Sequence, residues 1–391
     1  MNAIALAALR LAVLALLPAL ALGLDAPAGP AADPSPAVAI GTAARAPLRD
    51  LPVDLSLVPP ISLNGEGRVR NHLSLGLAIA RSTVLQGLAL APVHLAEEDV
   101  DGAQVTWIAA SAGGRVRGVQ LAYITSVAGQ LQGVQLTTVV NVLRGAGAGA
   151  QLASMVNVAT ARVTGFQASG AFNYAGEVVG AQASCVNLTS LTRGAQLAVV
   201  NVGGDVTGAQ VGLVNVARRV KGLQLGVLNL ADDADASVGV LSLVRSGRHD
   251  LELYVTEITT FNLAARLGGR TVHGLLVAGI QPGAQHPIGG TRWAAGLGVG
   301  TGAAIGHGLD LDADLLAQRV LHDWTTPHNV LVTARVLLGW RATPWIAIFG
   351  GPTASLFLSD DIQADLHHLG WKVNARTDSR AWVGFVAGLR I

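Results

Sequence analysis

Between residues 102 and 243 a short phrase, glycine followed by one variable residue and glutamine, returns at nearly even intervals. Successive glutamines are separated by 16, 15, 16, 16, 15, 14, 14 and 14 residues, and an asparagine follows each of the last seven by six or five residues. A period of this kind is typical of repeat architectures. The repeated amides are Gln104, Gln120, Gln135, Gln151, Gln167, Gln182, Gln196, Gln210 and Gln224, with Asn141, Asn157, Asn173, Asn187, Asn201, Asn215 and Asn229.

Two all-β architectures fit this period. In a parallel β-solenoid each repeat is one coil, coils stack about 4.8 Å apart, and each amide can bond its copy in the next coil. Such ladders would explain a polar residue inside an apolar phrase, because an unpaired buried amide costs about 1–3 kcal/mol. In a continuous antiparallel meander or barrel, the change from 16 to 15 residues would reverse the faces of a strand unless a bulge corrected it. The spacing favours a solenoid of about nine coils over residues 101–246.

The segments before the array predict export and a lead-in. Residues 1–23 combine Arg10, an apolar run and a small-residue cleavage motif, which is typical of a signal peptide. The apolar run covers 14 residues and contains Pro18, whereas a membrane-spanning helix needs roughly 20. Residues 24–50 are rich in Pro and Ala and predict an extended linker. Residues 51–100 read as short alternating strands and are expected to cap the array.

Residues 247–391 have a different character. They contain six of the seven tryptophans, and apolar and polar residues alternate over long runs. Strands of this length with an apolar face predict a small antiparallel outer-membrane barrel, and a soluble antiparallel sheet is the alternative. The predicted strands cover 251–260, 270–281, 291–304, 307–318, 328–341, 345–358 and 380–391, with the exit strand of the array at 238–246 as a possible eighth.

The bulk composition excludes several kinds of site. The formal net charge is +1, so the chain has no overall positive field to gather nucleic acid. Cys185 is the single cysteine, and neither an intrachain disulfide nor a cysteine-based zinc cluster can form. Later repeats hold Val199 and Leu213 at its position, which predicts a buried and inert thiol. No cofactor is expected.

Three patterns in the C-terminal region could carry chemistry. The segment Gly298-Val-Gly300-Thr-Gly302-Ala303 matches a dinucleotide motif but lies inside an alternating strand, where glycine would face a crowded interior. Three aspartates share one strand face and could bind a cation or form a polar row, with Arg335 or Arg380 as partner. The histidines lack metal-ligand spacing and a nearby nucleophile, which favours a surface role. The aspartates are Asp310, Asp312 and Asp314, and the histidine clusters are His322, Asp323 and His328, and His367 with His368.

The repeat also carries a family resemblance. The phrase Gly222-Leu-Gln-Leu-Gly-Val-Leu-Asn229-Leu-Ala, its looser copies, and the lead-in Ser56-Leu-Val-Pro59 with Asn71-His-Leu-Ser74-Leu-Gly resemble a family of bacterial surface repeat-containing proteins. The resemblance covers roughly residues 53–243. It implies an exported, envelope-associated protein without assigned catalysis.

The sequence thus predicts a non-catalytic protein of the outer membrane or cell surface, with a structural or interaction role toward a protein or glycan partner. A pore through the barrel and an enzyme with its site at the barrel mouth are the alternatives. A periplasmic location is the alternative to the outer membrane.

Overall fold

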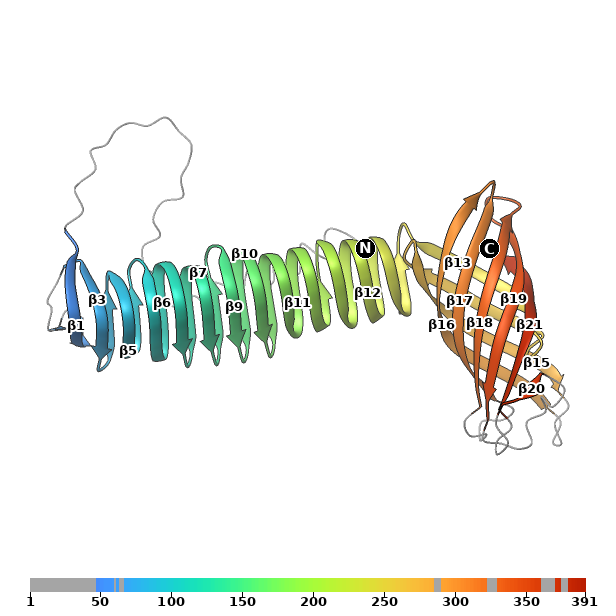
Figure 1. Ribbon diagram of the computed structural model, residues 1–391, viewed down its shortest axis with the longest axis horizontal. Helices are drawn as coiled ribbons and strands as arrows, with labels where there is room; N and C mark the ends of the chain where they lie inside the picture. Colours follow the sequence, from blue (N-terminus) through green and yellow to red (C-terminus); the bar gives the residue numbers. More distant parts are fainter. Residues whose placement is uncertain are drawn as a thin grey trace.

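The computed structural model describes residues 47–59, 61–62, 67–284, 290–321, 329–359, 370–373 and 379–391. A long parallel β-solenoid leads into a closed antiparallel barrel (Figure 1), so the predicted all-β fold is confirmed. No helix within these ranges is long and apolar enough to cross a membrane. The predicted signal peptide and residues 24–46 of the predicted linker lie outside the described residues.

The solenoid consists of strands that pair in parallel with their counterparts in the next coil. Copies of the repeat align residue by residue, with Gly118 opposite Gly133 and Gln120 opposite Gln135. Because neighbouring copies run in the same direction, the antiparallel alternative for the array is wrong. The strands are β1 (Arg49–Val58), β2 (Ile61–Ser62), β3 (Val69–Gly76), β4 (Ile79–Ser82), β5 (Val84–Ala96), β6 (Val100–Ala122), β7 (Thr125–Thr137), β8 (Val140–Leu143), β9 (Gly147–Ala153), β10 (Val156–Ser169), β11 (Phe172–Val202) and β12 (Asp205–Val244).

The stack begins well before the first predicted repeat. In the pairing of β1 with β3 and of β3 with β5, Asp54 lies opposite Ser74, and Ser74 lies opposite Ala89. Ala89 in turn lies opposite Gln104, the first glutamine of the array. The described part of residues 51–100 therefore forms coils of the same solenoid, and β2 runs antiparallel along β1.

The glycine before each glutamine has a steric cause. From Gly102 to Gly222 this glycine has a positive φ in every coil, between 130° and 149°. A Cβ atom there would lie inside the van der Waals radius of the carbonyl oxygen of the preceding coil's glycine. Glycine is therefore the one residue that fits this backbone conformation at this spacing between coils.

The barrel closes through eight long strands. The first strand, β13, pairs with β14 on one side and with the last strand, β21, on the other, where Leu253 lies opposite Leu389. A short strand, β20, adds to the edge of β21. The strands are β13 (Arg248–Val255), β14 (Phe261–Gly268), β15 (Val272–Ala284), β16 (Gly290–Gly306), β17 (Leu309–Leu321), β18 (Val330–Arg341), β19 (Ala347–Leu358), β20 (Trp371–Lys372) and β21 (Arg380–Arg390).

One strand of the barrel differs from the prediction. The run predicted as a single strand over 251–260 is divided by a turn, in which Thr256 N donates to Thr259 O at 3.1 Å. The chain beyond this turn forms β14, the eighth strand, while residues 238–244 belong to β12 of the solenoid. The turn contains neither glycine nor proline, so it left no recognisable signal in the sequence.

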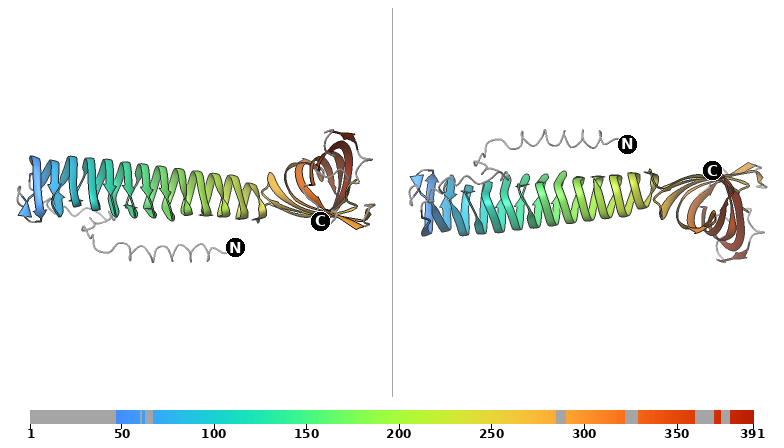
Figure 2. Two further views of the ribbon diagram at one scale, coloured as in Figure 1. Left: turned by 90° about the horizontal axis from the view of Figure 1, so that it is seen from below. Right: turned by 90° about the horizontal axis from the view of Figure 1, so that it is seen from above.

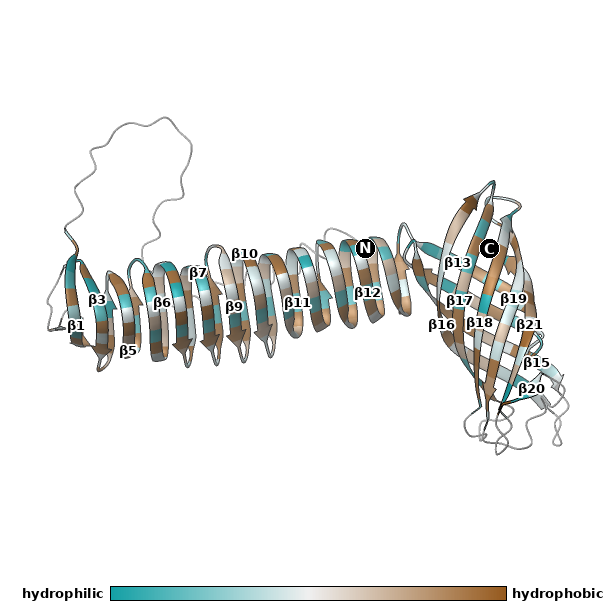
Figure 3. Cartoon of the chain, viewed as in Figure 1, coloured by the Kyte–Doolittle hydropathy of each residue, from teal (hydrophilic) through white to brown (hydrophobic). Residues whose placement is uncertain are grey.

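Side chains of the barrel alternate between wall and interior. On β13, Leu251, Leu253 and Val255 point outward, whereas Glu252 and Tyr254 are buried inside. The same alternation follows each long strand and appears in Figure 3 as bands of opposite hydropathy. The outer surface is therefore apolar, while most charged residues in the middle of these strands point into the interior.

The solenoid is joined to the barrel by continuous hydrogen bonding. Ala236 in the last coil pairs with Val272 at the start of β15. Arg270 N donates to Ala234 O and Thr271 N donates to Asp235 O, both at 2.9 Å. Figure 1 and the two views of Figure 2 show the solenoid extending sideways from the barrel, crosswise to the barrel axis.

Candidate functional sites: the amide ladders and the barrel interior

The nine glutamines form one continuous ladder inside the solenoid. All nine side chains are buried. Each Nε2 donates to the Oε1 of the glutamine in the preceding coil, at distances of 2.7–3.0 Å from Gln120 to Gln224. Every internal glutamine therefore donates one hydrogen bond and accepts one within the ladder. An unpaired amide at the same buried position would lower the stability of the fold.

The seven asparagines form a second ladder with the opposite polarity. From Asn141 to Asn215, each Nδ2 donates to the Oδ1 of the asparagine in the following coil, at 2.8–3.1 Å. Each Nδ2 also donates to a backbone carbonyl of that coil, such as that of Val211, 2.9 Å from Asn201 Nδ2. The two ladders thus run through the same core in opposite directions.

Other polar residues end the ladders. At the C-terminal side, Ser237 Oγ contacts Gln224 Oε1 at 3.5 Å, and Asn229 Nδ2 donates to Ser242 Oγ at 3.0 Å. Ser242 lies near the end of β12, in the last coil of the solenoid. At the N-terminal side Gln104 Nε2 meets the imidazole Nδ1 of His94 at 2.6 Å. His94 precedes the array, and the sequence analysis did not single it out.

His94 accepts this hydrogen bond only while its ring is neutral. It is completely buried, and burial lowers its pKa from 6.5 to about 4. The neutral ring leaves a lone pair on Nδ1 for the amide of Gln104. Protonation of His94 would place its Nδ1–H directly against the Nε2–H donor of Gln104 inside the buried coil.

This contact predicts a pH-dependent stability at the start of the array. Because the folded-state pKa lies below the unfolded value, the stability that the neutral ring contributes is complete above pH 6.5 and is lost as the pH falls toward 4. The expected loss is roughly 3 kcal/mol across this window. Hydrogen exchange of backbone amides in residues 85–112 measures it, and His94→Asn, which keeps an acceptor, should abolish this part of the dependence. Equal pH profiles in the wild type and in His94→Asn would contradict the assignment, and His249→Asn on the surface is the control.

Charged side chains converge inside the barrel. Arg266 is completely buried and lies 2.9 Å from Asp312, 2.9 Å from Asp314 and 3.2 Å from Glu252. Its Nε donates to His273 Nε2 at 3.1 Å. One guanidinium on β14 thereby connects carboxylates on β13 and β17.

Three further arginines complete this network, of which Arg248 lies 2.9 Å from Asp312. Arg335 lies 2.7 Å from Glu252 and 2.9 Å from Asp314, and its guanidinium stacks 5.1 Å above the ring of Tyr254. Arg390 lies 2.8 Å from Glu252 and 2.9 Å from Asp312. We call this network the charge cluster; its members are Arg248, Arg266, Arg335, Arg390, Glu252, Asp312, Asp314 and His273.

Glycines on β16 make room for the charge cluster. A Cβ on Gly300 would overlap the carboxylate of Asp314, and one on Gly302 would overlap that of Asp312. The glycine-rich segment is thus part of a strand facing a crowded interior, as the sequence indicated. Phe349 packs directly against the charge cluster, with Arg390 5.2 Å from its ring centroid, and further apolar side chains, among them Phe357 and Trp382, fill the rest of the interior.

The predicted aspartate row divides between two environments. Asp312 and Asp314 belong to the charge cluster, and Arg335 is the partner of Asp314 that the alternation predicted. Asp310 instead pairs with Arg341 at 3.6 Å near the barrel surface. No group of three or more His, Cys, Asp or Glu within the described ranges could hold a metal ion. The partners Glu252, Arg266 and Arg390 were missed, although Arg266 is the single charged residue of β14 and Glu252 lies between two leucines of β13.

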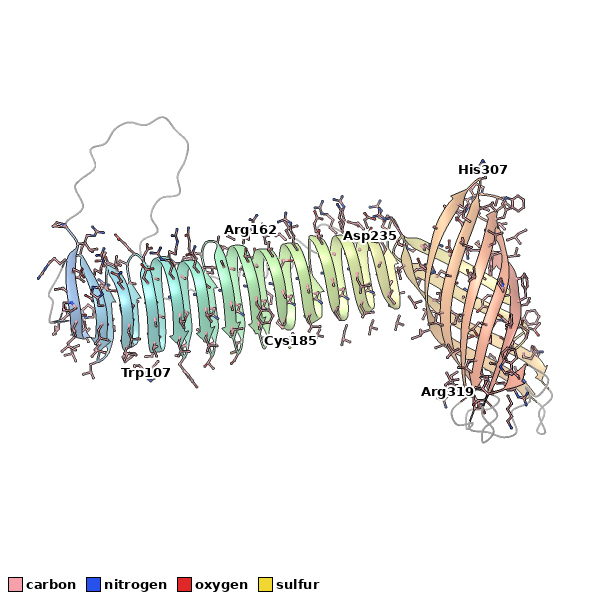
Figure 4. The ribbon with its side chains drawn as sticks, in the orientation of Figure 1. Trp107, Arg162, Cys185, Asp235, His307 and Arg319 are labelled. Carbon is pink, nitrogen blue, oxygen red and sulfur yellow. The ribbon has the colours of Figure 1, made fainter. Side chains whose placement is uncertain are left out.

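Cys185 is exposed, which corrects the prediction of a buried thiol. It lies where the chain bends around the edge of the rod (Figure 4), and its equivalents Val199 and Leu213 are exposed as well. The position of Cys185 is therefore an outer edge of the coil, although it holds apolar residues in later repeats. The neighbouring core residues are Gln182 before it and Asn187 after it.

The histidine clusters lie outside the described residues, namely His322, Asp323, His328, His367 and His368. Their predicted surface role stays a prediction.

Comparison of the chain with protein-family models, with curated proteins and with solved structures finds no match in any of the three. The case for a function therefore rests on the geometry of the solenoid and the barrel.

Proposed function

We propose that this protein is a non-catalytic component of the bacterial envelope, in which the barrel is an anchor in the outer membrane and the solenoid is a rod with a structural or interaction role. The observation that carries the proposal is the distribution of polarity in the barrel: an apolar outer wall around a charged and filled interior. A soluble barrel would show the reverse arrangement, because water would meet its outer wall.

Aromatic side chains mark two levels on the outer wall. Phe261, Trp293 and Trp371 are exposed near one end, and Trp340 and Trp345 are exposed near the other. Large aliphatic side chains such as Leu253, Leu297, Leu315 and Leu338 cover the wall between them. Two aromatic girdles around an apolar band are typical of barrels that span the outer membrane.

The distance between the girdles suits a bilayer. On β17, Leu321 lies opposite Trp293 and Leu309 lies opposite Trp340, so this strand of 13 residues connects the two levels. At about 3.3 Å per residue and a tilt of about 40°, it crosses roughly 30 Å. The hydrocarbon core of a bilayer has about this thickness.

The filled interior favours an anchor over a pore. The charge cluster bridges opposite walls at the level of Glu252 and Asp312, and packed apolar residues follow below it. An eight-stranded barrel is just wide enough for side chains to fill. We therefore expect no steady conductance when the protein is inserted into planar bilayers.

The connections between strands indicate the orientation of the barrel. The turns at the end that joins the solenoid cover residues 269–271, 307–308 and 342–346. The connections at the other end cover 256–260, 285–289, 322–329 and 359–379, which are longer on the whole. Because outer-membrane barrels have short periplasmic turns and longer external loops, the solenoid would lie on the periplasmic side.

Fractionation of cells that express the full chain tests the proposal. We expect the protein in the outer-membrane fraction, resistant to alkaline carbonate, with a gel mobility in SDS that changes on boiling because the barrel unfolds. A soluble periplasmic protein without this change would overturn the anchor. Stable conductance whose charge preference changes in Asp312→Asn would replace the anchor with a pore.

A further inference from the structure

One edge of the solenoid is largely apolar. The chain bends three or four residues after each glutamine, and large apolar side chains occupy this bend in most coils, whereas Thr138, Ser154 and Gly170 lie three residues after their glutamines in three central coils. Trp107 is 60% exposed and Leu213 is 56% exposed. We call this the apolar edge; its exposed members include Trp107, Tyr123, Met155, Val199, Leu213 and Val227.

The opposite edge carries the charges. Arg162 and Arg193 both pair with Glu177, which lies in the coil between them, and Arg218 pairs with Asp205. Figure 4 shows Arg162 and Asp235 on this charged edge, and Trp107 and Cys185 on the apolar edge across the rod. The rod is therefore amphipathic across its width, as an interfacial helix is.

A shallow apolar hollow continues from the apolar edge onto the neighbouring face of the rod. It has a volume of about 940 Å³, extends over several coils, and its lining includes Leu152, Leu197, Leu213 and Leu225. Apolar surface that is rimmed by polar residues in this way marks a site of interaction with a partner or a membrane.

The junction determines how this surface would meet a membrane. The rod extends crosswise to the barrel and lies beside its wall rather than beyond its end (Figures 1 and 2). Its apolar edge points toward the barrel end with the longer loops, which Arg319 marks in Figure 4, and its charged edge points toward the end with His307. A barrel that spans the bilayer would thus hold the rod parallel to the membrane plane, with the apolar edge facing the lipid.

We infer that the solenoid lies within the periplasmic leaflet of the outer membrane and parallel to the membrane plane, with its apolar edge immersed between phospholipids and its charged edge in the periplasmic water. This inference rests on the proposed anchoring of the barrel. Lipid is the occupant that fits, because the apolar edge continues at the level of the barrel's apolar band and no charge interrupts it. The hollow beside it accepts acyl chains.

Cys185 allows a direct test because it is the single cysteine and lies on the apolar edge. A nitroxide attached to Cys185 of the full chain, in vesicles of phosphatidylethanolamine and phosphatidylglycerol, reports its accessibility to oxygen and to a water-soluble nickel chelate. We expect high oxygen and low nickel accessibility. In a Cys185→Ser background, Arg219→Cys on the charged edge should show the reverse, and Leu338→Cys on the barrel wall reports whether the barrel itself is in lipid.

The outcomes separate the two proposals. A lipid-like signal at Leu338→Cys and at Cys185 supports both. A lipid-like signal at Leu338→Cys with a water-exposed label at Cys185 overturns the membrane-lying rod and leaves the anchor intact. A Cys185 label shielded from both reagents would show that protein, such as a second copy, covers the apolar edge, which also overturns the inference. A water-exposed label at Leu338→Cys overturns both.

Discussion

Replacing Gly194 by alanine is expected to unfold the middle of the solenoid. Gly194 has a φ of 133°, and the added Cβ would overlap the carbonyl oxygen of Gly180 in the preceding coil. The disfavoured backbone conformation and the overlap together should destabilise the array by about 3 kcal/mol or more. Because each coil contacts only its neighbours, hydrogen exchange should show lost protection that is centred on the coils around Gly180, Gly194 and Gly208.

The neighbouring residue provides a matched control. Ala195 points outward from the same coil, and equivalent positions hold Val119, Phe166 and Leu223. Ala195→Leu should therefore change stability by less than about 0.5 kcal/mol. Equal protection in Gly194→Ala and Ala195→Leu would show that the coils can separate enough to admit a side chain, against the steric account of the repeat.

Removing the charge of Glu252 is expected to have the largest effect in the barrel. Glu252 is completely buried between Arg335 at 2.7 Å, Arg390 at 2.8 Å and Arg266 at 3.2 Å. Glu252→Gln keeps the shape but leaves four arginines of the charge cluster facing two carboxylates. The loss of one member of a buried ion pair typically costs about 3–5 kcal/mol. The midpoint of urea unfolding of the barrel in lipid vesicles, followed by tryptophan fluorescence, measures the loss.

A carboxylate with a single, half-exposed partner near the rim of the same barrel serves as the control. Asp310 lies 3.6 Å from Arg341, whose side chain is half exposed. Asp310→Asn should cost less than about 1 kcal/mol. Adding Arg390→Gln to Glu252→Gln restores the charge balance and should recover part of the loss. A Glu252→Gln barrel as stable as Asp310→Asn would mean that water reaches the charge cluster, and it would reopen the case for a pore.

Local patterns in the sequence were sufficient to predict the solenoid. The recurrence of Gln and Asn reflects one physical requirement, that a buried amide needs a partner, and stacking identical coils is the simplest way to supply it. Parallel stacking also tolerates coils of 14 and 16 residues, because the register is restored at each Gly and Gln. The alternation of Leu251 with Glu252 likewise indicated which face of a barrel strand is outside.

Long-range pairings could not be predicted in this way. Glu252 and Arg390 are 138 residues apart and meet only because the barrel closes. His94 ends the glutamine ladder from a coil that lacks the repeat phrase. The exposure of Cys185 could not be predicted for a different reason. An apolar residue at a bend recurs with the same sequence period as an apolar residue in the core. Sequence periodicity alone therefore does not distinguish the outer edge of a coil from its core.

The head-to-tail order of both ladders has a consequence for the evolution of this chain. Each coil that carries both amides presents one donor and one acceptor to either neighbour, so such a coil can be duplicated or deleted without leaving an amide unpaired. Each coil that is added or removed changes the length of the rod by about 4.8 Å. Gene duplication can lengthen or shorten it while His94, Ser237 and the barrel continue to terminate it in the same way.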